Sequence, residues 1–145
     1  MIARRGFTLL EFLVAVGIGV LISGVTVVYL RRAEPGRVLE ASSRALVTDL
    51  RLALQLAVAS QIIHEVRFDT VGKRYAIMAL ETPEVTVKEI NLNPHVSFGN
   101  ITLPGQIAQF NALGAVTASG NIVLQHQDGN VRTILISPSG YVQTQ

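Results

Sequence analysis

One carboxylate lies beside the most apolar stretch of this sequence. Residues 12–30 contain 19 positions without a charged side chain, and Glu11 comes immediately before them. At a rise of about 1.5 Å per residue, this run approaches the roughly 30 Å thickness of a bilayer core, so we expect a membrane helix. An unpaired charge in lipid costs about 2.5 to 3.5 kcal/mol, which makes Glu11 a candidate functional group. It needs either a cationic partner or a place near the helix end from which it reaches the headgroups.

Histidine, serine and cysteine chemistry has less support. His64, His95 and His126 have none of the spacings typical of metal sites, and we expect them on solvent-facing strands or loops. His126, Asp128 and Ser137 have the side-chain types of a catalytic triad, but no nucleophile-elbow or oxyanion motif accompanies them. The absence of cysteine excludes disulfides, cysteine-ligated zinc and a thiol nucleophile. We therefore expect no catalytic residue, no metal and no cofactor.

The net charge depends on the first six residues. The formal charge of +2 includes Arg4 and Arg5, and without residues 1–6 the chain has ten basic and ten acidic side chains. From residue 38 onward there are seven basic side chains against eight acidic ones. The overall charge is therefore no signature of nucleic-acid binding, which depends on neutralising phosphates.

Two kinds of export signal share a basic start followed by an apolar run. A secretory signal has an apolar region of about 7 to 15 residues and a small-x-small cleavage site, whereas this run is longer and ends in YLRR at 29–32. A twin-arginine signal would use Arg4 and Arg5, but its basic region would be very short and no cleavage site follows the run. A membrane anchor explains residues 12–30 better than either signal.

Beyond the apolar run the sequence first predicts an interruption and then an amphipathic helix. Glu34-Pro35-Gly36 predicts a kink or a short break, because proline removes a backbone donor and disfavours helix in the residue before it. The following stretch has the apolar spacing of a helix that packs one face on a sheet. This stripe consists of Leu46, Leu50, Ala53, Leu54 and Ala57.

After residue 60 the pattern alternates between polar and apolar side chains. It predicts strands at 65–69, 75–78, 86–92, 121–125 and 131–136. Turns are predicted at 71–73, at 128–130 and in SPSG at 137–140. We therefore expect an α+β fold, in which a long amino-terminal helix, membrane-spanning in its first half, precedes a small antiparallel β head.

The start of the chain, RGFTLLE at 5–11 followed by the apolar run, resembles the class III signal of type IV prepilins and pseudopilins. The resemblance implies that a membrane peptidase cuts after Gly6, that Phe7 becomes an N-methylated amino terminus, and that Glu11 contacts the Phe7 amine of a neighbouring subunit. Its spacing of four residues places Glu11 on the same helical face as Phe7. The implied organisation is a leader at 1–6, a transmembrane and filament-core helix at 7–31, a hinge and amphipathic helix at 32–60, and the β head at 61–145.

The rest of the chain is similar to the GspH/FimT family of minor pseudopilins and minor type IV pilins. The stretches concerned are DLRLA at 49–53, VRFD at 66–69, YAI at 75–77, FNALG at 110–114 and ILISPSG at 134–140. The resemblance implies a non-enzymatic subunit at or near the tip of a type IV pilus or a type II secretion pseudopilus.

The same resemblance implies a location and a set of partners. The partners would be other pilin subunits, the prepilin peptidase and methylase, and the inner-membrane assembly platform. Arginines on both sides of the apolar run leave its orientation undecided. The resemblance alone places the leader in the cytoplasm, with a single pass through the bacterial inner membrane and the head in the periplasm or outside the cell.

DNA capture is the alternative function, because some FimT-like minor pilins bind DNA through a basic carboxyl-terminal motif. Here the tail YVQTQ at 141–145 contains no arginine or lysine. The remaining candidates for a phosphate-binding patch are Arg67, Lys73, Arg74 and Arg132. Scattered charges that keep strand edges soluble explain the same residues.

Overall fold

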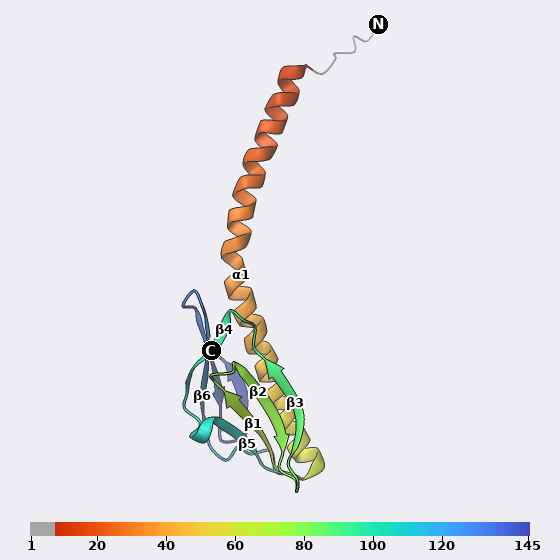
Figure 1. Ribbon diagram of the computed structural model, residues 1–145, viewed down its shortest axis with the longest axis vertical. Helices are drawn as coiled ribbons and strands as arrows, with labels where there is room; N and C mark the ends of the chain where they lie inside the picture. Colours follow the sequence, from red (N-terminus) through yellow and green to blue (C-terminus); the bar gives the residue numbers. More distant parts are fainter. Residues whose placement is uncertain (1–7) are drawn as a thin grey trace. The chain divides into compact units, whose positions relative to one another are not determined.

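The computed structural model describes residues 8–145, except for the side chains of residues 24–35. The chain divides into two compact units, one ending at Glu34 and the other beginning at Pro35. Helix α1 (Leu9–Ser60) contributes to both units (Figure 1). It begins after Thr8, whose Oγ1 accepts a hydrogen bond from the Glu11 amide at 3.3 Å and so caps the first turn.

Helical structure continues through Glu34, Pro35 and Gly36, so the predicted short break is absent. Proline in a helix interior removes one intrahelical hydrogen bond and costs about 3 kcal/mol or more, which favourable neighbours have to offset. Here leucine, arginine, alanine and glutamate, all good helix formers, surround the position on both sides. The prediction of a short break was wrong because these neighbours favour the helix on both sides.

No helix among the residues with described side chains is long and apolar enough to cross a membrane. The predicted span at 7–31 includes Phe7 and residues 24–31, which lie outside that description.

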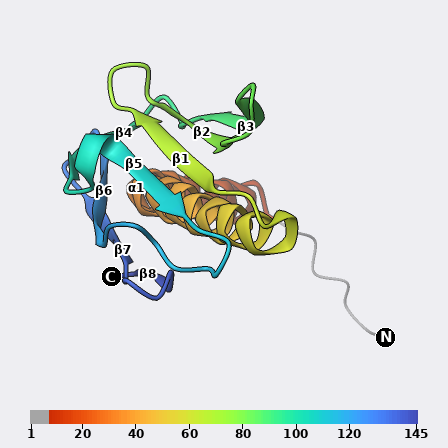
Figure 2. The same cartoon turned by 90° about the horizontal axis from the view of Figure 1, so that it is seen from below.

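The second unit contains two four-stranded antiparallel sheets. The first has the order β3-β2-β1-β5 and consists of β3 (Val85–Asn91), β2 (Arg74–Ala79), β1 (His64–Asp69) and β5 (Ile107–Phe110). The second has the order β4-β6-β7-β8 and consists of β4 (Val96–Ile101), β6 (Gly120–His126), β7 (Val131–Ile136) and β8 (Val142–Thr144). A short 3-10 helix, η1 (Pro104–Gln106), precedes β5. Figure 2 shows the two sheets on different sides of the second half of α1.

The predicted α+β fold is confirmed. The five predicted strands correspond to β1, β2, β3, β6 and β7, and the predicted turn at 137–140 is closed by a hydrogen bond from the Gly140 amide to the Ser137 carbonyl oxygen. Strands β4, β5 and β8 were not predicted. Strands β5 and β8 have only four and three residues, too few for alternation to be recognised.

The core forms where the apolar stripe of α1 meets the inner faces of both sheets. Leu46, Leu50, Ala53 and Ala57 of the predicted stripe are fully buried, whereas Leu54 is only partly buried. The sheets supply, among others, Val66, Tyr75, Ile77, Phe110, Ile122, Leu124, Ile134 and Ile136. The helix is therefore the central element of the head, and its side chains determine how the two sheets are held.

Candidate functional site

The predicted processing site falls at the border of the described residues. Gly6 and Phe7 lie outside them, whereas Glu11 lies in the first turn of α1 and is exposed. Thr8 and Glu11 have the spacing of a capping box, in which a threonine at the helix start is followed three residues later by a glutamate. The observed contact is that of the Thr8 hydroxyl with the Glu11 backbone amide, so Thr8 caps the first turn whatever the Glu11 carboxylate contacts. The Thr-x-x-Glu spacing was visible in the sequence and was overlooked.

The first turns of α1 present apolar side chains outward. Every side chain from residue 8 to residue 23 is exposed, including Leu9, Leu13, Val20 and Leu21. A contiguous apolar surface of this kind on an otherwise folded protein marks a place where lipid or another protein packs. This part of the helix has the surface of an element that belongs in an apolar surrounding.

Inside the head, one buried carboxylate joins the helix to the first sheet. Asp49 is 4 % exposed. The Tyr75 hydroxyl of β2 donates to its Oδ2 at 2.7 Å, and Nζ of Lys88 of β3 donates to its Oδ1 at 2.6 Å. Burial first, and then the hydrogen bond to Asp49, raises the pKa of Tyr75 well above its usual range. The buried Asp49 and Tyr75 and the half-exposed Lys88 form a polar cluster, which we call the Asp49 clamp.

A second group of polar contacts joins the same stretch of helix to the other sheet. Nη2 of Arg51 donates to the Val142 carbonyl oxygen of β8 at 2.9 Å, and the hydroxyls of Ser43 and Thr144 lie 3.5 Å apart. Asp49 and Arg51, both in the DLRLA stretch, therefore bind different sheets. The two polar residues of this stretch position the helix between the sheets.

Two glycine turns meet on the helix near its end. The Asn111 side-chain oxygen accepts hydrogen bonds from the amides of Leu113 and Ala115 at 2.9 and 3.0 Å, which fixes the FNALG turn. Gly140 of the SPSG turn has φ 78°, and a Cβ there would collide with the Gly114 carbonyl oxygen and lie 2.6 Å from Cδ1 of Leu54. The close approach requires glycine at position 140, so these stretches of family resemblance are packing motifs.

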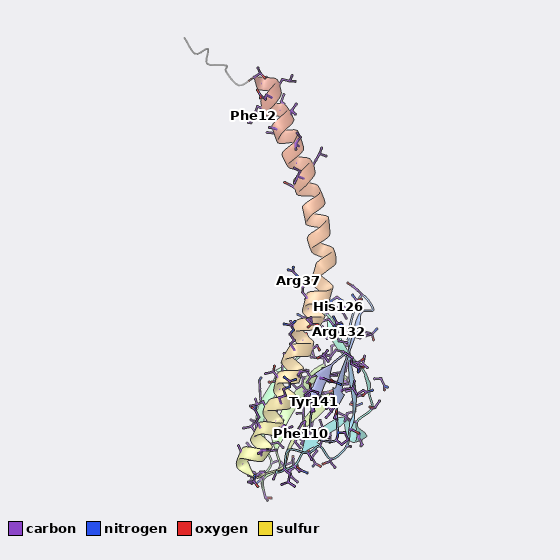
Figure 3. The ribbon with its side chains drawn as sticks, turned by 180° about the vertical axis from the view of Figure 1, so that it is seen from behind. Phe12, Arg37, Phe110, His126, Arg132 and Tyr141 are labelled. Atoms are coloured by element: carbon purple, nitrogen blue, oxygen red, sulfur yellow. The ribbon has the colours of Figure 1, made fainter. Side chains whose placement is uncertain are left out.

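The four basic candidates for DNA contact do not form one patch. Arg67, Lys73 and Arg74 belong to β1, β2 and the turn between them, whereas Arg132 belongs to β7 of the other sheet. Figure 3 shows Arg132 beside α1, where its Nε lies 3.3 Å from Oε2 of Glu40. Nζ of Lys73 donates to the Pro94 carbonyl oxygen at 3.4 Å.

The two arginines of the first sheet are each shared between two carboxylates. Nη1 and Nη2 of Arg67 donate to the two carboxylate oxygens of Glu84, at 3.0 and 3.1 Å, and its Nε donates to Glu65. The corresponding carboxylate partners of Arg74 are Asp69 and Glu89, both at 3.0 Å. The Arg67 guanidinium lowers the pKa of Glu84. A phosphate would have to compete with two carboxylates at each arginine.

Two of the three histidines are buried, contrary to the prediction that they face solvent. His64 and His126 are 4 % and 7 % exposed, so the prediction that they face solvent was wrong for these two, whereas His95 is exposed. Nδ1 of His126 accepts a hydrogen bond from the Asp128 amide at 3.2 Å, and Nδ1 of His64 lies 3.0 Å from the Ile62 carbonyl oxygen. Both rings thus complete local backbone hydrogen bonding. Among the described residues, no group of three potential ligands could hold a metal ion.

An amino-terminal helix packed on antiparallel sheets is the architecture of the pilin class. Solved structures that share it include the type IV minor pilin FimU of Pseudomonas aeruginosa and the minor pseudopilin EpsH from the type 2 secretion system of Vibrio cholerae. FimU has a TM-score of 0.64 and 17% identity over 78% of this chain and 91% of its own. EpsH has a TM-score of 0.64 and 13% identity over 74% of this chain and 95% of its own. Neither protein-family models nor curated protein sequences match the chain. The chain therefore has the fold of minor pilins and minor pseudopilins.

Proposed function

We propose that this chain is a non-enzymatic minor pilin or pseudopilin subunit, which is cleaved after Gly6, methylated at Phe7 and assembled at or near the tip of a filament. The observation that carries the proposal is the combination of a pilin-like head with a helix whose first turns expose apolar side chains on all sides. Residues 7–31 would lie in the inner membrane before assembly and in the filament core afterwards. The head would lie outside the cytoplasm.

Glu11 would contact the Phe7 amine of a neighbouring subunit. Pairing the two charges removes the cost of leaving either unpaired in an apolar bundle, and paired buried charges fix geometry more reliably than they add stability. The pair would therefore set the axial register between subunits. The peptidase, the assembly platform and other pilin subunits are the partners that this role requires.

Processing is tested by intact-mass and fragment spectra of the chain, expressed with and without a prepilin peptidase. We expect loss of residues 1–6 and a methylated Phe7 only when the peptidase is present. Retention of residues 1–6 in the presence of an active peptidase contradicts the proposal.

The Glu11 role is tested with Glu11→Gln. Glutamine serves as well as glutamate in a capping box, so the helix start is preserved while the charge is lost. We expect normal membrane insertion but loss of incorporation into filaments. Glu81→Ala, which removes an exposed carboxylate from the head, serves as the charge-matched control. Normal incorporation of the glutamine variant would contradict the role assigned to Glu11.

A further inference from the structure

Strand β3 has an open edge. Within the part of the chain that the structure describes, it is the outermost strand of its sheet and pairs with β2 alone (Figure 2). The opposite edge of the same sheet is covered, because the Thr117 amide donates to the Gln109 carbonyl oxygen of β5 at 2.9 Å. In the other sheet, one carbonyl oxygen of the edge strand β8, that of Val142, accepts a hydrogen bond from Arg51. An open edge offers a row of backbone donors and acceptors to another extended chain.

Lys88, the lysine of β3, is bound to the helix and does not protect the open edge. Proteins protect exposed edge strands by placing charged side chains, above all lysine, on them. Lys88 is the lysine of β3, but its ammonium group is bound to the buried carboxylate of Asp49. The side chain is thereby held under the sheet and does not block the approach of a second strand.

A bulge limits the length of the open edge. Lys88 pairs with Ile77 and Thr86 pairs with Met78, so Val87 has no partner on β2. A bulge bends and twists the strand that carries it. The regular part of the edge is therefore Lys88, Glu89, Ile90 and Asn91, which can pair with a short extended segment.

The surroundings of this edge are acidic. Glu81, Glu84 and Glu89 are exposed in β3 and the segment before it. Glu84 and Glu89 are bound to Arg67 and Arg74, but these arginines also bind Glu65 and Asp69, so four carboxylates face two guanidinium groups and the balance stays negative. The positive charge of Lys88 is already offset by Asp49. A partner that complements this edge carries basic side chains.

We propose that the Lys88–Asn91 edge of β3 binds an extended segment of another polypeptide that carries basic side chains at alternate positions. Backbone hydrogen bonds to β3 supply the pairing, and the carboxylates select for the basic side chains. This inference does not depend on cleavage after Gly6 or on filament assembly, so its test and that of the proposed function can fail separately.

The test uses the full chain in non-ionic detergent micelles with the peptide acetyl-KTKVKTK-amide, followed by hydrogen exchange at single amides. Two control peptides are acetyl-ETEVETE-amide, which reverses the charge, and acetyl-KPKVKPK-amide, which keeps the lysines but cannot pair as a strand. We expect the lysine peptide alone to slow exchange at alternate amides of residues 88–91, by about tenfold or more at saturation.

A pair of variants tests the selection for basic side chains. Glu89→Gln should weaken binding of the lysine peptide about two- to fivefold, as expected for one exposed carboxylate. Glu40→Gln makes the same change beside the other sheet and should leave binding unchanged. If the proline peptide slowed exchange at these amides as much as the lysine peptide does, charge attraction would explain the effect and the proposal would be overturned. Slower exchange only outside β3, or no change in exchange, would also overturn it.

Discussion

Because Asp49 is the centre of the Asp49 clamp, we expect its substitution to lower the free energy of unfolding more than that of any other polar residue of the head. In Asp49→Ala the buried Tyr75 hydroxyl loses its acceptor, and leaving such a group unsatisfied costs about 1 to 3 kcal/mol. Lys88 is 47 % exposed and returns to water, so its lost ion pair adds at most about 1 kcal/mol. We expect the free energy of unfolding to fall by about 2 to 3 kcal/mol, toward the middle of this combined range.

Substituting Tyr75 as well tests whether the unpaired hydroxyl causes this loss of stability. Tyr75→Phe removes the donor and should cost about 1.5 to 3 kcal/mol, the value of a hydrogen bond to a charged group. In the double variant no hydroxyl is left unpaired. Its loss of unfolding free energy should therefore be smaller, by about 1 to 2 kcal/mol, than the sum of the losses in the two single variants.

The assay is urea unfolding of the full chain in mild detergent, followed by far-UV circular dichroism. The slope of the free energy against urea should be unchanged if the variants alter stability and not compactness. Strict additivity of the two substitutions, or a loss below about 0.5 kcal/mol in Asp49→Ala, would refute the assignment of a shared buried hydrogen bond.

Three further outcomes follow from the geometry of the head. Gly140→Ala should destabilise by more than about 3 kcal/mol, because its Cβ meets backbone, whereas Gly129→Ala, also at positive φ but in open space, should cost only about 1 kcal/mol in the same unfolding assay. Arg51→Met should leave the Val142 carbonyl oxygen without its donor, so hydrogen exchange in β8 should quicken while exchange in β5 stays unchanged. The raised pKa of Tyr75 means that its contribution to stability is complete below about pH 10, the ordinary tyrosine value, and decreases as the pH rises above it. Unfolding measured between pH 9 and 11 should therefore show a smaller loss of stability in Tyr75→Phe than in the unchanged chain, and equal losses would contradict the shift.

The elements with long, regular patterns were predictable from the sequence. The amphipathic stripe follows from its spacing, because burial on one face imposes a period on the element, and the five strands follow from alternation or from apolar runs beside turn signals. The stretch Val96–Ile101 escaped prediction because its ladder is irregular between Phe98 and Ile101 and includes a glycine and an asparagine. Strand β8 depends on β7 and on Arg51 for its position, which no local pattern reveals.

The candidate site was predictable only in part. The resemblance identified Asp49 as a member of a motif, but its partners Tyr75 and Lys88 come from two different strands, and only the folded chain brings them together. The same holds for Arg67 and Arg74, which count as free cations in the sequence and are shared between carboxylates in the fold. Whether a charged side chain is free to bind a ligand depends on its partners in the fold, and these partners cannot be read from the composition.

The tie points between the helix and the two sheets have a mechanical consequence. Ser43, Asp49 and Arg51 lie within about three helical turns, and together they contact both sheets. A force applied along α1 would load these contacts and the surrounding core in parallel and in shear, because each sheet is held to the helix by its own polar contacts. Hydrogen bonds that share a load must break together, whereas bonds loaded in series break one after another. The head is therefore built to stay on a helix that is pulled or pushed along its axis.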